Sequence, residues 1–136
     1  MLIRFIIYGL LGWNMEVIWT GFAEILHGSP NLIGHTSLWM FFIYGSASFL
    51  LEPIHTRIRR LHWLLRGCIW AGLIFAIEFI SGTLLKLIGI TAWNYTGTFA
   101  VLGVIRLDYF PAWAAAGLIF KKIHDMLVRY NIGVKR

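Results

Sequence analysis

The sequence predicts an all-α membrane protein in which four transmembrane helices form one domain over residues 1–136. Apolar residues make up 59% of the chain and charged residues only 13%, about half the charged share of soluble domains. The mean hydropathy is +0.74, and so small a chain has too little interior to bury that much apolar surface in water. A single cysteine excludes a disulfide scaffold. We therefore expect an integral, multi-pass protein of a bacterial inner or plasma membrane.

The first two predicted spans cover residues 2–26 and 35–51, because a spanning helix needs about 20 mainly apolar residues. A turn-rich segment at residues 27–31 separates them. The second span is expected to end at Glu52-Pro53, since proline disfavours further helix. A signal peptide is the alternative for the first span, but its apolar stretch exceeds the usual length of about 7–15 residues and no small-residue cleavage site follows.

The third and fourth predicted spans cover residues 63–88 and 98–120, and a connector rich in glycine, threonine and aromatic residues joins them. The tail over residues 124–136 is expected to be a fraying amphipathic end. Most of the twelve Lys and Arg lie in the loop between the second and third spans or after residue 120. Because cytoplasmic loops are enriched in these residues, both termini and the middle loop are predicted to face the cytoplasm.

A short internal repeat relates the first and third spans. The GLL and EVI strings within residues 9–18 parallel GLI and EFI within residues 72–80. Since the two spans would run in the same direction, a parallel two-plus-two repeat is geometrically allowed. Shared membrane composition is the alternative explanation for so short a similarity.

Carboxylates inside the predicted spans mark a polar site. A charged side chain at mid-membrane costs about 2.5–3.5 kcal/mol on insertion scales, so it needs a partner or a function. Glu16 and Glu78 lie at similar depths, each in a stripe of small or polar residues that lets helices approach closely. We expect both to point into one site open toward the outer side, with Arg106 as counter-ion. The alternative is that they are protonated or Arg-paired contacts between helices.

Six further residues complete the predicted ligand-binding set. His35 lies at the outer mouth of the second span and Tyr44 lies deeper in it, whereas Asp108 lies below the outer end of the fourth span. Asn94 and Tyr95 lie in the connector, which could fold back as a lid. For the aromatic and histidine members the alternative is an ordinary position at the membrane interface. They are Trp13, His35, Tyr44, Asn94, Tyr95 and Asp108.

Several chemistries lack their sequence signatures. The chain has no phosphate-binding loop, no paired C-x-x-C, no H-E-x-x-H and no nucleophile elbow. We therefore expect no metal, no cofactor and no ATP hydrolysis by the chain itself. Although the isoelectric point is about 9.9, the basic residues gather at the ends of spans, so no nucleic-acid partner is expected.

A series of motifs resembles the transmembrane protein 229 family, whose bacterial relatives are grouped as a type IV ABC-transporter membrane family. The motifs are YGxxGWxxE at residues 8–16, GHTSLW at 34–39, IYG at 43–45, EFxxG at 78–82, WNY at 93–95 and LxYxPAW at 107–113. The resemblance covers nearly the whole chain and implies a small multi-pass membrane protein. It points to Glu16, Tyr44, Glu78, Asn94 and Tyr95. Asn94 departs from the aspartate expected in the WNY motif, so a charge is missing there.

These observations favour a binding or transport role for a lipid headgroup, a cation or a small polar solute. Membrane lipids are expected partners, and the aromatic and small-residue stripes suit a homo-oligomer. One alternative is an enzyme acting on a lipid or isoprenoid, with Glu16 or Glu78 as general acid or base. The other is a non-catalytic accessory subunit of a larger membrane complex.

Overall fold

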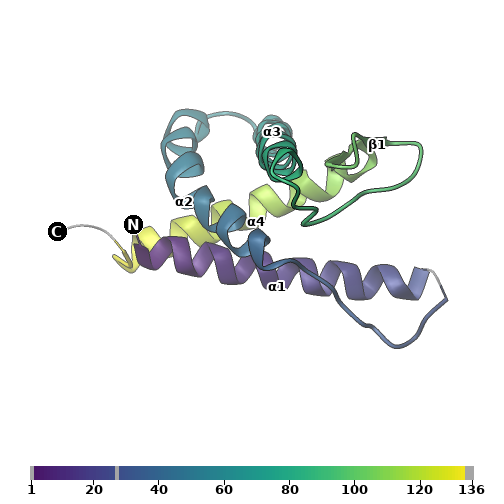
Figure 1. Cartoon of the computed structure of the whole chain (residues 1–136). Helices are drawn as coiled ribbons and strands as arrows, with labels where there is room; N and C mark the ends of the chain where they lie inside the picture. Colours follow the sequence, from purple (N-terminus) through teal and green to yellow (C-terminus); the bar gives the residue numbers. More distant parts are fainter. Residues whose placement is uncertain (1, 27, 134–136) are drawn as a thin grey trace.

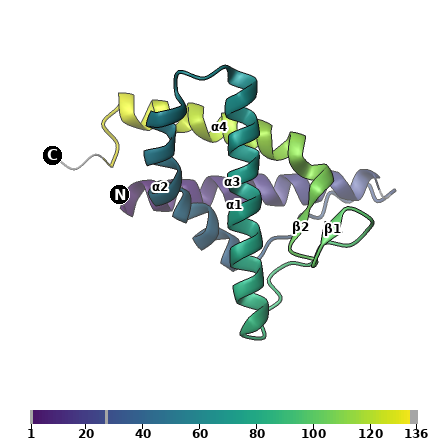
Figure 2. The same cartoon turned by 90° about the horizontal axis from the view of Figure 1, so that it is seen from above.

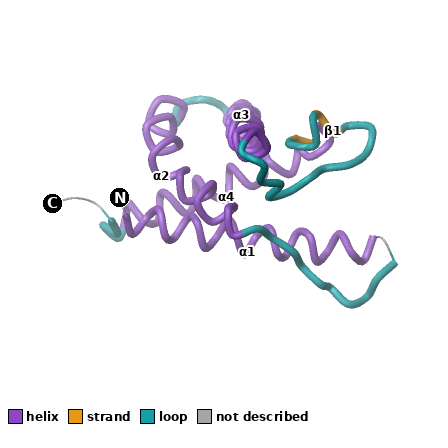
Figure 3. Tube along the Cα trace, viewed as in Figure 1, coloured by secondary structure: helices purple, strands orange, loops and turns teal. Residues whose placement is uncertain are grey.

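The computed structural model describes residues 2–26 and 28–133, apart from the side chains of residues 51 and 52. Lys135 and Arg136 of the basic tail therefore lie outside the described residues. The described chain is mainly helical, with one small hairpin before the last helix (Figure 3). The elements are α1 (Leu2–Leu26), α2 (Leu38–Ile58), α3 (Trp63–Leu87), β1 (Ala100–Val101), β2 (Ile105–Arg106), the 3-10 helix η1 (Leu107–Tyr109) and α4 (Phe110–Arg129) (Figure 1).

The helices pack mainly as two pairs, α1 with α2 and α3 with α4. Helix α4 also runs antiparallel to α1. At the start of α1, Arg4 Nε donates to the carbonyl of Ile132, which follows α4, at 2.8 Å. Near the end of α1, the ring of Trp19 lies 5.5 Å from that of Tyr109, which precedes α4. Helix α3 instead crosses α1 and α4 (Figure 2). The parallel relation expected between the first and third helices is therefore not the arrangement that the structure has.

Helices α1 and α3 are each 25 residues long and apolar enough to cross a membrane. Their bounds agree with the predicted spans to within one residue. The apolar part of α2 is shorter, from Leu38 to Leu50. Large apolar side chains are exposed along all four helices, as expected for a surface that meets lipid rather than water.

Helix α2 differs from its predicted bounds at both ends. It begins at Leu38 rather than residue 35, because Ser37 is its N-cap and accepts a hydrogen bond from the backbone N–H of Trp39 at 3.3 Å. It also continues through Pro53 to Ile58. The extension is held to α4 by an ion pair between His55 Nε2 and Asp125 Oδ1 at 3.2 Å, which helps to offset the backbone hydrogen bond that proline removes.

The fourth predicted span is wrong over its first half. Residues 98–109 form the hairpin and η1, and α4 begins only at Phe110. The chain reverses at Leu102 and Gly103, which have φ values of 52° and 67°, a conformation that no helix contains. Proline suits the first turn of a helix, and Pro111 occupies it in α4. At its other end α4 runs to Arg129, past the point where fraying was expected.

A polar cluster ties α1, α2 and α4 together near the chain ends. The Tyr8 hydroxyl shares a hydrogen bond with His124 Nδ1 at 3.0 Å, and the rings of His55 and His124 lie 4.9 Å apart. Lys121 Nζ bonds Asp125 Oδ2 at 2.6 Å. Tyr8, His55 and residues 121–125 come from three distant parts of the chain, so their spacing in the sequence does not reveal the cluster.

Replacing Tyr8 by phenylalanine is expected to lower the free energy of unfolding by about 1 kcal/mol, because a buried hydrogen bond is lost while the ring remains. Thermal unfolding in detergent, followed by circular dichroism, measures this. An exposed ring serves as control, since Tyr130→Phe removes a hydroxyl from a side chain that is 68% exposed. Equal midpoints for the two variants would contradict a structural role for the Tyr8 hydroxyl.

Candidate ligand pocket

All four helices and the connector before the hairpin enclose a pocket of about 750 Å³. This lies within the range of roughly 300–1,000 Å³ typical of sites for small molecules. Its walls are mostly aromatic and aliphatic, with three carboxylates and one histidine, and no Lys or Arg is among the described residues that line it. The carboxylates are Glu16, Glu24 and Glu78, and the aromatic rings are Trp19, Tyr44, Trp93, Tyr95, Tyr109, Trp113 and Phe120.

Glu78 is the most deeply buried carboxylate in this pocket. It projects from α3 and is only 3% exposed. Its Oε1 accepts a hydrogen bond from the Tyr95 hydroxyl at 3.3 Å, and the Trp113 indole lies beside the same carboxylate. Its Oε2 has no well-formed hydrogen bond within residues 2–26 and 28–133. Burying a polar atom without a hydrogen bond costs free energy. A ligand that donated a hydrogen bond to this oxygen would therefore gain more binding energy than at other positions in the pocket.

The connector brings Tyr95 to Glu78. The indole N–H of Trp93 donates to the Val104 carbonyl at 2.9 Å, and the backbone N–H of Tyr95 donates to Gly103 O at 2.9 Å. Burial, followed by the charge of Glu78, raises the pKa of Tyr95 above its usual range. The phenol therefore stays protonated and acts as a hydrogen-bond donor to the carboxylate.

Glu16 lies in α1 on the opposite wall of the pocket and is half-buried. Its Oε2 accepts a hydrogen bond from the Thr36 hydroxyl at 3.1 Å. The loop that carries Thr36 is fixed to α1 by Thr20, whose hydroxyl accepts from His35 N–H at 2.8 Å and lies 2.9 Å from His35 O. Glu16 and Glu78 line the same pocket, so the two carboxylates belong to one site.

Tyr109 connects the aromatic part of the wall. Its ring meets those of Trp19, Tyr95 and Trp113 edge-on, with centroids 5.5, 5.6 and 6.5 Å away. Such edge-to-face contacts fix the orientation of aromatic rings. Rings from α1, the connector, η1 and α4 therefore form one ordered surface beside the carboxylates.

The structure brings six of the nine predicted ligand-binding residues to this pocket and leaves three outside its lining. The six are Glu16, His35, Tyr44, Glu78, Asn94 and Tyr95. Asn94 lies at an exposed edge, where its Oδ1 accepts a hydrogen bond from Lys86 Nζ at 3.2 Å. Outside the lining, the Trp13 indole donates to Ser37 O at 3.1 Å and thereby holds the start of α2 on α1.

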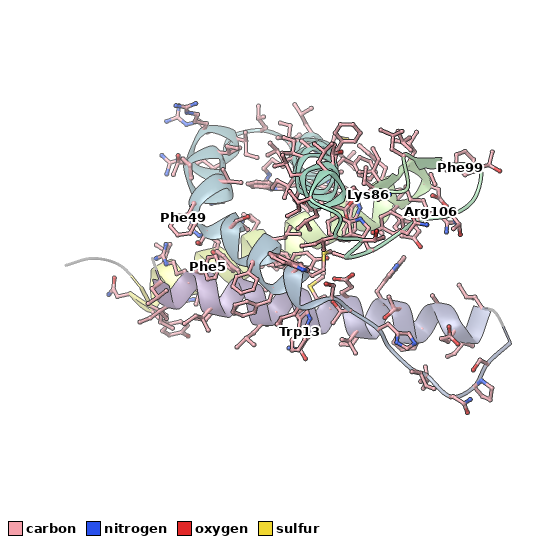
Figure 4. All side chains as sticks on the ribbon, in the orientation of Figure 1. Phe5, Trp13, Phe49, Lys86, Phe99 and Arg106 are labelled. Carbon is pink, nitrogen blue, oxygen red and sulfur yellow. The ribbon has the colours of Figure 1, made fainter. Side chains whose placement is uncertain are left out.

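The expectation that Arg106 is the counter-ion of a buried glutamate is wrong. Arg106 Nε pairs with Asp108 Oδ1 at 2.8 Å, and the guanidinium lies 4.9 Å from the centroid of the Tyr109 ring. Arg106 belongs to strand β2, so the helical spacing that would have directed it inward does not apply. Figure 4 shows Arg106 and Lys86 near the hairpin, on the same side of the molecule.

Sequence reasoning missed several lining residues. Thr36, Tyr109 and Trp113 lie within the GHTSLW and LxYxPAW strings, so the motifs already contained the signal for them. Trp19 and Glu24 lie three and eight residues after Glu16, on the same helix face. Within the described part of the chain no group of three or more His, Cys, Asp or Glu is arranged to hold a metal ion.

A family model described as Putative ABC-transporter type IV matches residues 3–135. This match confirms the resemblance to the bacterial family that the motifs indicated. No solved structure matches the chain.

Proposed function

The chain belongs to the ABC-transporter type IV family, and from this premise we propose that it binds a small polar ligand in the pocket between its helices, as part of transport across the membrane. Family membership and two helices that are long and apolar enough to cross a bilayer indicate a membrane protein in a transport-related complex. The observation that carries the proposal is the Glu78 carboxylate, which is 3% exposed and has one oxygen without a well-formed hydrogen bond among the described residues.

The proposed location is a bacterial inner or plasma membrane, with both chain termini in the cytoplasm. The basic residues after residue 120 and near the middle loop support this orientation. Arg4 bonds Ile132 near the two ends of the described chain, whereas the pocket is lined by α1 from Gly12 to Glu24. With the termini in the cytoplasm, the pocket is displaced toward the outer side of the membrane.

The proposed setting is a larger membrane complex. The sequence has no G-x-x-x-x-G-K-[ST] loop, so nucleotide hydrolysis in such a complex would belong to another subunit. The exposed apolar side chains on all four helices support contacts with lipid, with further copies of this chain or with other membrane subunits.

Native mass spectrometry of the protein, released gently from its own membrane, tests the proposal. We expect the wild type to retain a defined small molecule and Glu78→Gln to lose it, because the amide keeps the size of the side chain but not its charge. Ser81→Ala is the control, since Ser81 lies one turn farther along α3, is not among the residues that line the pocket, and donates its hydroxyl only to backbone oxygens, Ile77 O at 2.6 Å and Glu78 O at 3.4 Å. The same spectra give the number of subunits.

Two results would overturn the ligand-binding role. One is the same retained molecule at the same occupancy in Glu78→Gln. The other is a folded wild-type protein that carries nothing specific and binds no added solute of any charge.

A further inference from the structure

We propose that the ligand of this pocket is an organic cation, an alkylated ammonium or a similar ion with an apolar body. The inference rests on the proposed function, and it adds the charge and the shape of the ligand. Three properties of the pocket carry it: the acidic side chains in its lining, the aromatic nature of its walls and the buried carboxylate of Glu78.

The pocket is lined by acidic side chains and by no Lys or Arg among the described residues. The acidic residues are Glu16, Glu24 and Glu78. The nearby cations have other partners: Arg106 is neutralised by Asp108 at 2.8 Å, and Lys86 donates to Asn94 Oδ1 and to Leu102 O. An anion would therefore find no Lys or Arg in the described lining with which to pair, whereas a cation would find carboxylates.

The walls favour an organic cation over a metal ion. Calcium takes about 6–8 oxygen ligands and magnesium requires near-octahedral oxygen geometry. The pocket, with a volume of about 750 Å³, offers instead carboxylates on different helices among aromatic rings. Cations with delocalised or shielded charge are attracted to aromatic faces within about 6 Å of the ring centroid, and quaternary ammonium ions are bound in this way.

The aromatic surface around Tyr109 is placed for such contacts. It combines Trp19, Tyr95 and Trp113 on three sides of one ring. The Arg106 guanidinium already makes a cation–π contact with Tyr109, 4.9 Å from the centroid of its ring. An organic cation bound between α1 and α4 would contact these rings with its apolar body, while its charge faced the carboxylates.

Glu78 supplies the specific contact. Its Oε2 is buried without a well-formed hydrogen bond among the described residues, although the Trp113 indole lies beside the carboxylate, and Tyr95 already occupies Oε1. Glu16 and Glu78 repel each other when both are charged, and a cation between them would offset that repulsion. A neutral ligand could donate a hydrogen bond to Oε2 but would leave the repulsion in place.

Binding of tetraphenylphosphonium to the full-length protein in detergent tests the inference, with tetraphenylborate as an anion of the same shape. Equilibrium dialysis, corrected with protein-free micelles, gives the affinity and the stoichiometry of each ion. We expect saturable binding of the cation, at least tenfold tighter than binding of the anion. Glu78→Gln and Glu16→Gln should each weaken cation binding at least tenfold, and Ser81→Ala should leave it unchanged, with folding of each variant checked by circular dichroism.

Saturable anion binding as tight as cation binding would overturn the inference, and so would cation affinity unchanged in both glutamine variants. Binding of tetraphenylborate or of neutral triphenylmethanol that is lost in Glu78→Gln would leave the proposed function intact and refute only the charge of the ligand. Failure of the cation, the anion and the neutral compound to bind saturably to folded wild-type protein would refute both.

Discussion

Replacing Gly117 by alanine is expected to lower the free energy of unfolding by about 2–3 kcal/mol, the upper range for overpacking a closed contact. Gly117 is buried in α4, and a Cβ at this position would overlap Cβ of Trp70 on α3. Trp70 is itself only 2% exposed, and the overlap involves the root of its side chain, so a rotamer change cannot relieve it. Thermal unfolding in detergent, followed by circular dichroism, measures the loss.

Gly72→Ala is the matched control for this prediction. Gly72 lies on α3 close to Trp70, but a Cβ there would meet no atom within 4 Å. Since alanine favours a helix over glycine by about 1 kcal/mol, this variant should be as stable as the wild type or more stable. If Gly117→Ala matched the stability of Gly72→Ala, the close contact between α3 and α4 would be wrong.

Replacing Gly34 by alanine is expected both to destabilise the protein and to abolish ligand retention in the native mass spectrum. A Cβ on Gly34 would overlap the backbone oxygen of Val17 on α1, and backbone cannot move aside as a side chain can. The loop would lift from α1, which would break the bonds between His35 and Thr20 and take the Thr36 hydroxyl away from Glu16. We expect a loss of about 2–3 kcal/mol in unfolding free energy, together with a disordered mouth of the pocket.

A neighbouring substitution separates these effects from a general sensitivity of the loop. Ile33 is 54% exposed, so Ile33→Ala should change neither the unfolding temperature nor the retained ligand by much. A Gly34→Ala protein that kept both its stability and its ligand would show that the loop does not need to touch α1.

The sequence predicted the helices whose length and apolar content leave little choice. For α1 and α3, 25 residues of nearly continuous apolar sequence set the bounds. The same criterion failed at residues 98–109, because the hairpin is as apolar as a span and only its backbone conformation at Leu102 and Gly103 distinguishes it. The crossing of α3 over α4 could not be predicted, since it depends on contacts between distant residues such as Trp70 and Gly117.

The candidate site was predictable where burial has a high energetic cost. Glu16 and Glu78 stood out because carboxylates are expensive inside a membrane, and both line the pocket. Arg106 was misplaced by the same reasoning, since a charge in an apolar stretch was taken to face inward. Its partner is Asp108, two residues away, and strand geometry rather than helix geometry brings them together. The aromatic wall was only partly foreseen, because aromatic residues at membrane depth are common and their number alone does not locate a site.

The pairing of α1 with α2 and of α3 with α4 has a mechanical consequence. Each pair is held by its own close helix contacts, whereas α2 and α3 touch much less and the pocket separates much of α1 from α4. A rotation of one pair against the other would widen or narrow the space between them without repacking either pair, the kind of rigid-body movement that hinged proteins use. The short segment between Ile58 and Trp63 would act as the hinge, and the cluster of His55, His124 and Asp125 would resist the rotation at the opposite end from the pocket mouth.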